Sequence, residues 1–235
     1  MPQGVPEAIE TLIDPRSFAP SADAPPVVHP LGFPGYADAL DRARTASGAG
    51  ESVVTGAAAI GGVPVEIASF EFSFLGGSMG AGTGELLARA LERSARRGVP
   101  FVLRTATGGA RMQEGMASLV QMPKVVVARR DLAAAHQPFV ALLGHPTTGG
   151  VLASLAALAD VTVAEAGATL GFAGPRVVET ATGRKLGPHS HTAESAFAAG
   201  LVDAVVDAAG ARDVLARALS ILTAPAPATP DTAPE

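Results

Sequence analysis

The stretch that decides the fold is residues 70–97, FEFSFLGGSMGAGTGELLARALERSARR. Its aromatic start, residues 70–75, is typical of a strand, and a glycine-rich loop follows over residues 76–84. Residues 85–97 place leucine and alanine at helical spacing, and Gly98 is the residue type that commonly ends a helix. We therefore expect a strand, a glycine-rich loop and a helix in this order.

The same order recurs further along the chain. Strands expected over residues 99–105 and 139–143 are each followed by a glycine-containing turn or loop, and each loop by a helix. The other expected elements are a hairpin of strands 52–59 and 63–70, helices 36–46, 112–136 (with a possible break at Pro123), 151–159, 193–199 and 211–222, and strands 160–164, 168–172 and 202–206.

Alternating strands and helices predict the α/β class, with parallel strands covered by helices. Each repeat ends its strand in glycines and begins a helix there, so several helix N-termini with unpaired N–H groups should lie at strand ends. Such groups suit an oxyanion, a phosphate or an enolate.

The 235 residues are expected to form one main domain between two proline-rich ends. We assign residues 1–50 to a Pro-rich N-terminal arm with a short helix, 51–222 to the main domain, and 223–235 to a disordered Ala/Pro tail. Proline fixes φ and removes a backbone donor, which disfavours regular structure at both ends.

Composition argues against several classes of protein. The net charge of −5 and the lack of a basic cluster argue against a nucleic-acid binder. No apolar run has the length of a membrane span, and the first residues do not resemble a signal peptide, so a cytoplasmic protein is expected. The count of 0 cysteines excludes disulfides, a thiol nucleophile and a cysteine-based zinc site.

The first glycine loop contains a G-x-S-x-G pattern, residues 76–80, between a strand and a helix. This is the context of a serine nucleophile at Ser78, and Asp160 followed by His189 or His191 would give a permitted order of acid and base. No local signature supports these partners, so a close-packed turn is the favoured interpretation. The loop is not a P-loop, because no lysine follows its glycines.

The second and third loops each contain a glycine pair, Gly108-Gly109 and Gly149-Gly150. Glycine lets a substrate approach the main chain, because no β-carbon stands in the way. Each pair could donate one N–H group to the same carbonyl oxygen. Either loop alone is more simply a tight strand-to-helix connection, but the two together, in neighbouring units, favour a binding site.

Other polar residues leave alternatives open. Arg111 could hold a phosphate or carboxylate, or pair with Glu114. His189 and His191 could bind metal, but no third ligand stands at a typical spacing, so no metal site is assigned. Residues 171–179, GFAGPRVVE, predict a turn with an Arg–Glu contact that could frame a pocket or a subunit contact.

Five runs, in this order and spacing, resemble the beta subunit of bacterial acetyl-CoA carboxylase carboxyltransferase. They are FEFSFLGGSMG (70–80), GGARMQE (108–114), SLVQM (118–122), PTTGGV (146–151) and GFAGPRVVE (171–179). The likeness is firm over about residues 52–206. Residues 12–18, LIDPRSF, resemble the segment that precedes the catalytic domain in this family.

The resemblance implies a ClpP/crotonase-type fold of repeated ββα units. It also implies transfer of a carboxyl group from biotin, held on a separate carrier protein, to a short acyl-CoA, as from acetyl-CoA to malonyl-CoA. In the family, biotin's own ureido nitrogen can take the α-proton, so backbone amides that hold the enolate are the catalytic groups. Carried over, these are Gly108, Gly109, Gly149 and Gly150, and the expected substrate contacts are Gly76, Gly77, Ser78, Met79, Arg111, Phe172, Gly174 and Pro175.

The resemblance further implies a hetero-oligomer with an alpha-type carboxyltransferase subunit and a biotin carboxyl carrier protein. Two features depart from the family. Its usual four-cysteine zinc ribbon has no counterpart in a chain with 0 cysteines, so no zinc is expected. Residues 187–191, GPHSH, stand where the family usually has a Pro-Gly-aromatic-Gln type of stretch.

Three rival functions remain at this stage. A malonyl-CoA or malonyl-thioester decarboxylase would use the same enolate site and protonate the enolate. A serine hydrolase would use Ser78, and a catalytically silent scaffold would only pair with an alpha subunit.

Overall fold

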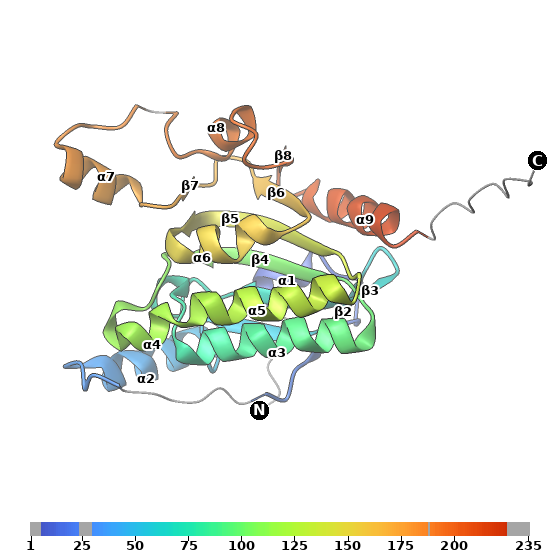
Figure 1. The fold of residues 1–235 in the computed structure, drawn as a ribbon, viewed down its shortest axis with the longest axis horizontal. Helices are drawn as coiled ribbons and strands as arrows, with labels where there is room; N and C mark the ends of the chain where they lie inside the picture. The colour runs from blue at the N-terminus through green and yellow to red at the C-terminus, as the bar shows by residue number, and fades with distance from the viewer. Residues whose placement is uncertain (1–5, 24–29, 188, 225–235) are drawn as a thin grey trace, which may run out of the picture.

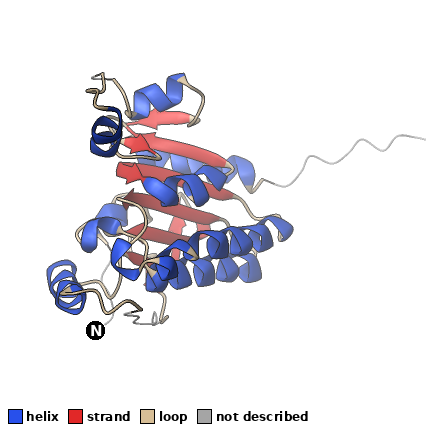
Figure 2. Cartoon of the chain, turned by 60° about the vertical axis from the view of Figure 1, so that its left-hand side comes forward, coloured by secondary structure: helices blue, strands red, loops and turns tan. Residues whose placement is uncertain are grey.

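One mixed sheet forms the centre of the molecule, and helices cover both of its faces (Figure 1, Figure 2). The computed structural model describes residues 6–23, 30–187 and 189–224. Within these ranges the sheet has 8 strands in the order β1-β2-β3-β4-β5-β6-β8, with β7 paired to β5. This arrangement confirms the expected α/β class.

The strands are β1 (Ala19–Pro20), β2 (Val53–Ile60), β3 (Val63–Phe70), β4 (Phe101–Thr107), β5 (Phe139–Thr148), β6 (Val161–Glu165), β7 (Leu170–Gly171) and β8 (Ala204–Val206). The helices are α1 (Glu7–Glu10), α2 (Tyr36–Ser47), α3 (Ala81–Arg97), α4 (Met116–Leu119), α5 (Gln121–Ala134), α6 (Gly149–Ser154), α7 (Pro175–Thr182), α8 (Ala193–Ala198) and α9 (Ala211–Leu222). Short 3₁₀ turns are η1 (Leu75–Gly77), η2 (Met112–Glu114) and η3 (Ala156–Leu158).

The sheet is antiparallel at one edge and parallel in the rest. β1, β2 and β3 pair antiparallel, whereas β3, β4, β5, β6 and β8 run parallel. The expected hairpin is confirmed: Ile60 pairs with Val63 across Gly61 and Gly62, whose φ angles are +58° and +81°. Because parallel strands end at the same edge, the loops that follow β3, β4 and β5 are brought together there.

Alternating side chains of the strands fill two cores. Phe101 and Leu103 of β4 face one side, where they pack with α3 and α5. Val102, between them, faces the other side, where α1 and α9 cover the sheet. This two-residue period, with both faces apolar, is the pattern expected of a sheet covered on both sides.

The N-terminal arm contacts the main domain through α2. Tyr36, Leu40 and Ala43 are buried and form a small third core with Phe74. The boundaries expected at residues 50 and 222 remain a prediction. Residues 24–29 of the arm and 225–235 of the expected tail lie outside the described residues.

The strand predicted over residues 70–75 is wrong. β3 ends at Phe70, and residues 71–77 form turns. Phe72 is exposed, whereas Phe74 is buried beside α2. The aromatic residues therefore serve separate local contacts and do not continue the strand.

Four other element predictions need correction. α3 begins at Ala81, within the stretch predicted as a loop, and β5 continues to Thr148, where the glycines predicted a loop. The long helix expected over 112–136 divides before Gln121 and not at Pro123. Pro123 lies in the first turn of α5. Backbone N–H groups there have no acceptor within the helix, so the missing N–H of proline costs no hydrogen bond. Residues 175–182 form a helix where a turn was expected.

The described helices include none with both the length and the apolar character needed to cross a bilayer.

Candidate functional site

The second and third glycine loops are in direct contact. A β-carbon on Gly149 would lie 2.8 Å from the Cα of Gly109, and one on Gly109 would lie 3.1 Å from the Cα of Gly149. Both residues also have positive φ angles, +104° at Gly109 and +71° at Gly149. Glycine alone satisfies the space and the backbone conformation together. The two glycine pairs that the sequence singles out therefore meet.

Most N–H groups of the two pairs already have protein acceptors. The bonds run from Gly108 to the Gly76 carbonyl (2.9 Å), from Gly109 to Thr107 Oγ1 (3.0 Å) and from Gly149 to the Phe172 carbonyl (2.9 Å). These three amides hold the loops together. They are not available to a ligand.

Two other N–H groups are available. Among the described residues, the N–H groups of Ala110 and Gly150 have no protein acceptor. The Gly150 nitrogen lies 3.5 Å from the position of a β-carbon on Gly109, and Ala110 follows Gly109 in the chain. Both residues are half-buried. The two free donors thus lie beside Gly109, one in its own loop and one in the loop that packs against it.

The direction of the Ala110 N–H is fixed by hydrogen bonds to Met79. The Gly109 carbonyl accepts from the Met79 N–H at 2.8 Å, and the Arg111 N–H donates to the Met79 carbonyl at 3.0 Å. In a trans peptide the C=O and N–H groups point in opposite directions. The Ala110 N–H therefore points away from Met79 and the first glycine loop. The Gly150 N–H lies in the first turn of α6, whose N–H groups point out of the helix.

Arg111 is fully buried, and its guanidinium fastens the first glycine loop. It donates to the Ser78 carbonyl at 2.7 Å and to Ser78 Oγ at 3.2 Å. It also forms ion pairs with Glu51 and Glu114. The pairing with Glu114 is thus confirmed. Because all three guanidinium nitrogens have protein acceptors, the structure gives no support to a direct contact between Arg111 and substrate.

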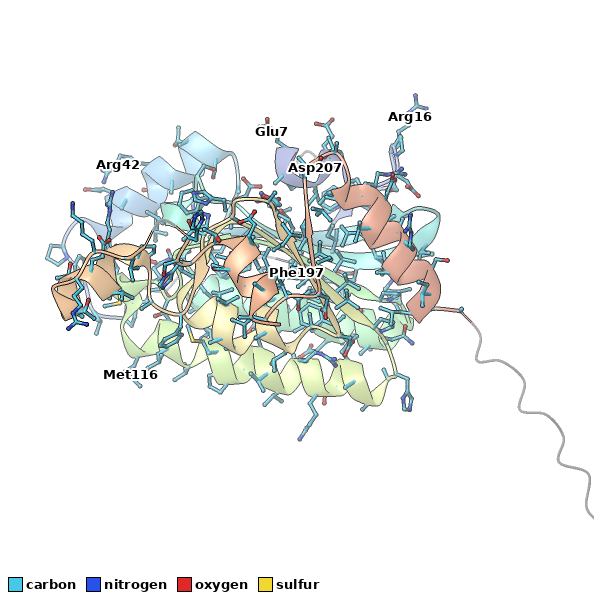
Figure 3. The ribbon with its side chains drawn as sticks, turned by 90° about the horizontal axis from the view of Figure 1, so that it is seen from above. Glu7, Arg16, Arg42, Met116, Phe197 and Asp207 are labelled. Atoms are coloured by element: carbon cyan, nitrogen blue, oxygen red, sulfur yellow. The ribbon has the colours of Figure 1, made fainter. Side chains whose placement is uncertain are left out.

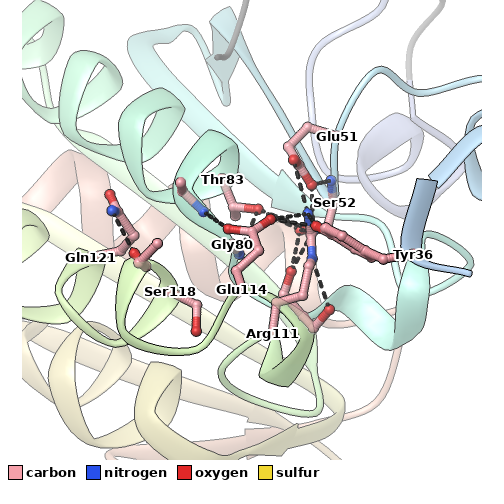
Figure 4. A network of polar contacts seen from close by, with 12 residues as sticks. Tyr36, Glu51, Ser52, Gly80, Thr83, Arg111, Glu114, Ser118 and Gln121 are labelled. Atoms are coloured by element: carbon pink, nitrogen blue, oxygen red, sulfur yellow. Dashed lines mark hydrogen bonds and ion pairs between the residues drawn. The ribbon is translucent and has the colours of Figure 1, made fainter. Parts of the chain in front are cut away.

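Glu114 connects this cluster to the arm and to the start of α3 (Figure 4). Its carboxylate accepts hydrogen bonds from the Tyr36 hydroxyl and from the N–H of Ala81, the latter at 2.6 Å. A carboxylate is favourable at this position because the N-terminus of a helix carries partial positive charge. Gly80 leaves the necessary room, since a β-carbon there would lie 2.5 Å from Glu114 Oε1.

Electrostatics keep the Tyr36 hydroxyl and the Arg111 guanidinium protonated at neutral pH. Burial, together with the hydrogen bond to Glu114, raises the pKa of the Tyr36 hydroxyl, so it remains a donor. Burial alone would lower the pKa of Arg111, but the hydrogen bond and charge of Glu51 raise it overall. The guanidinium therefore stays charged between its two carboxylates.

Ser78 lacks the partners of a hydrolytic serine among the described residues. Its Oγ accepts a hydrogen bond from Arg111, and no histidine bonds to it. Asp160 lies elsewhere and binds Arg129 and the N–H of Phe139 at the start of β5. The arrangement gives no support to the hydrolase alternative and agrees with a close-packed turn.

Exposed apolar side chains follow the second loop. We call these residues of η2, of α4 and just after α4 the apolar rim: Met112, Met116, Leu119 and Val120, which are 80%, 67%, 50% and 49% exposed. Met116 lies at the periphery of the molecule (Figure 3). A group of this kind is typical of a surface that another molecule covers.

The remaining predicted substrate contacts lie beside the third glycine loop or within the first glycine loop. The Phe172 carbonyl binds the Gly149 N–H, while its side chain is 71% exposed. Gly174 and Pro175 begin α7 just beyond it. Gly77 packs against β4, since a β-carbon there would lie 2.0 Å from the Ala106 carbonyl oxygen. Met79 is fully buried, so its main chain alone takes part.

No grouping of three His, Cys, Asp or Glu side chains suited to a metal ion occurs within the described ranges.

The sequence matches the family described as "Carboxyl transferase domain" over residues 5–234. The chain belongs to the carboxyl transferase family.

Curated relatives in this family are carboxyltransferase subunits of acetyl-CoA carboxylase, and the chain is their homologue. The beta subunit of Opitutus terrae is 42% identical over 224 residues, which is 94% of this chain and 77% of the relative. The fused beta/alpha protein of Salinispora tropica is 45% identical over 218 residues. This alignment covers 92% of the chain but 38% of the fused relative. As a homologue of these subunits, the chain is an enzyme component.

Solved structures show the same carboxyl transferase fold. Transcarboxylase 12S, solved with methylmalonyl-coenzyme A and methylmalonic acid bound, has a TM-score of 0.78 at 29% identity, covering 93% of this chain and 41% of that one. The Pseudomonas malonate decarboxylase hetero-dimer has a TM-score of 0.72 at 28% identity, covering 93% and 86%. These matches confirm the expected crotonase-like fold class.

Sequence reasoning missed three members of this candidate site. Ala110 stands next to the glycine pair but is an ordinary residue type. Tyr36 and Glu51 lie 75 and 60 residues before Arg111 in the chain. No local pattern links such distant positions. The one available signal is that Tyr36 is the single tyrosine in 235 residues.

Proposed function

We propose that the chain is the beta-type subunit of an acyl-CoA carboxyltransferase. It would transfer a carboxyl group from biotin, carried on a separate protein, to a short acyl-CoA, with acetyl-CoA as the first choice. The relatives named as acetyl-CoA carboxylase subunits, at 42% and 45% identity, support this substrate.

The observation that supports the chemistry is the pair of free N–H groups of Ala110 and Gly150 beside Gly109. When a proton leaves the α-carbon of an acyl thioester, negative charge develops on the thioester oxygen. Two main-chain donors that are already oriented can stabilise this charge without reorganising, and one such donor is typically worth roughly 3–4 kcal/mol.

When bound, biotin supplies the carboxyl group and takes the α-proton, so the chain needs no side-chain base. The role of this chain would be to bind the thioester oxygen and to orient the α-carbon of the acyl group toward the incoming carboxyl group. The donor set suits this task, because the negative carboxylates of Glu51 and Glu114 are each paired with Arg111.

We further propose that the site is completed by an alpha-type subunit. The fused relative is named for beta and alpha subunits together, and this chain spans 38% of it. The apolar rim offers a surface for this partner next to the second loop. Phe172, Gly174 and Pro175 would form the opposite border of the substrate site, beside the third loop, and Gly76, Gly77, Ser78 and Met79 would support the second loop from behind. The biotin carrier, the hetero-oligomer and a cytoplasmic location remain predictions of the resemblance.

A malonyl-thioester decarboxylase is the second candidate, favoured by the similarity to the Pseudomonas malonate decarboxylase hetero-dimer. One assay separates the two functions. The chain, co-purified with an alpha-type subunit, is given malonyl-CoA with and without biotin. Acetyl-CoA formed only with biotin supports carboxyl transfer, whereas biotin-independent formation supports decarboxylation. No turnover and no binding of either CoA ester would contradict both.

A further inference from the structure

Ala110 has no side chain able to fix the direction of its own N–H. That direction depends on the two hydrogen bonds that Met79 forms with Gly109 and Arg111. Met79 in turn depends on its neighbour Ser78, whose carbonyl is bound by the Arg111 guanidinium at 2.7 Å and by Ser52 Oγ at 2.7 Å.

Arg111 therefore acts twice on the same turn. Its main-chain N–H binds Met79, and its side chain binds Ser78. The guanidinium is held from the opposite side by Glu51 and Glu114. A shift of the guanidinium would therefore disturb the Ser78 carbonyl and, through the next residue, the hydrogen bonds of Met79.

Tyr36 closes this chain of contacts. Its hydroxyl donates to the same Glu114 oxygen that Arg111 contacts, and it also lies 3.4 Å from Arg111 Nη1 (Figure 4). Tyr36 is the first residue of α2 and 2% exposed, and it reaches the cluster from the N-terminal arm.

We propose that Tyr36 is a positioning residue of the carboxyltransferase site, acting through Glu114 and Arg111 on the Ala110 N–H. The inference rests on the proposed function. It gives the arm a part in catalysis: α2 fixes the orientation of a donor that belongs to a loop on the main domain.

Tyr36→Phe tests this directly, because it removes only the hydroxyl. In the complex with the alpha-type subunit, we expect kcat to fall on the order of ten-fold while the KM for the acyl-CoA changes less than about two-fold, as small displacements of a catalytic group slow the reaction without removing binding contacts. The matched control is Thr45→Val, which removes a hydroxyl from the same helix. Thr45 is exposed and its hydroxyl binds the Asp41 carbonyl of its own helix, so activity should not change.

A spectroscopic readout separates positioning from a merely structural role. The carbonyl band of acetyl-CoA labelled with ¹³C at its carbonyl shifts to lower frequency when the oxygen accepts hydrogen bonds. Tyr36→Phe should reduce this shift in the bound ester, and Thr45→Val should not. A variant that is only less stable would unfold at a lower temperature but keep the wild-type position of the carbonyl band while it is folded.

Ser52→Ala provides a second, independent variant in case Tyr36→Phe does not fold. It removes a different contact to the Ser78 carbonyl and should lower kcat about three- to ten-fold by the same route. Wild-type kcat and the wild-type band position in folded Tyr36→Phe, or in Ser52→Ala where Tyr36→Phe does not fold, would overturn the positioning role, while wild-type turnover leaves the proposed function intact. Absence of any turnover or ester binding in the wild-type complex would contradict the proposed function itself.

Discussion

Arg111 and Glu51 form a buried ion pair between residues 60 positions apart in the chain, with the Arg111 side chain 0% and the Glu51 side chain 8% exposed. The pair joins the segment that enters β2 to the loop that follows β4. The two ions of a buried pair depend on each other, because removal of one leaves the other charge buried and uncompensated.

Glu51→Gln should therefore destabilise the protein strongly. Glu114 still faces Arg111 at 3.4 Å, so we expect a loss at the lower end of the range for buried pairs, about 3 kcal/mol in the free energy of unfolding. Urea denaturation followed by circular dichroism measures it.

Asp41→Asn is the control for this change, since the Asp41–Arg44 pair is exposed. Its effect should stay within about 0.5 kcal/mol. Equal losses in the free energy of unfolding of the two variants would show that burial does not increase the contribution of the Arg111–Glu51 pair to stability.

Gly109→Ala and Gly108→Ala should differ sharply in activity. A β-carbon on Gly109 meets Gly149 at 3.1 Å in a backbone conformation with φ +104°, so it displaces both free donors. We expect kcat to fall about 100-fold or more. At Gly108 the nearest atom would be the Gly76 oxygen at 3.6 Å, an ordinary contact, so the loss should be much smaller.

Steady-state kinetics of the two folded variants tests this difference. Comparable kcat values would contradict the assignment of the donors to the two sides of Gly109.

Ser78→Ala should lower kcat less than about ten-fold. The Ser78 carbonyl, which binds Arg111, is kept, and only the Oγ contact at 3.2 Å is lost. Removal of a catalytic serine typically costs about a million-fold in kcat. A loss of that size in the carboxyl transfer assay would revive a nucleophilic role for Ser78.

Glu71→Gln should stabilise the protein at neutral pH. Burial raises the pKa of the Glu71 carboxyl, and its Oε1 has no hydrogen-bond partner in the part of the chain that the structure describes. A folded-state pKa above the ordinary value of 4.5 means that ionisation favours the unfolded state. The gain of the variant should therefore be smallest below pH 4.5 and grow as pH rises through the raised pKa.

Asp14→Asn should show the opposite dependence. Hydrogen bonds from the Gly62 main chain and from Arg212 lower the pKa of Asp14. Its stabilising effect is present above the ordinary pKa of 3.8 and is lost as pH falls through the lowered folded-state pKa. Thermal unfolding of both variants between pH 3 and 7 would show two slopes of opposite sign, and parallel slopes would contradict the pKa directions.

The sequence by itself determined the elements that local patterns encode. The hairpin turn at Gly61-Gly62, α2 and α9 follow from periodicity and turn residues, since both depend on neighbours a few positions apart. The glycine runs identified the family and the loops of the site. Local patterns failed where a segment's role depends on a distant partner, as at residues 70–75, whose Phe74 packs against α2.

Only the tertiary structure decided which amides are free and what orients them. Four glycine N–H groups were candidates, but three of them are used by Gly76, Thr107 and Phe172, and Ala110 takes their place beside Gly150. Likewise, Tyr36 meets Glu114 across 78 residues. A hydrogen bond depends on distance and direction in space, and the order of residues along the chain fixes these only within a turn or a helix.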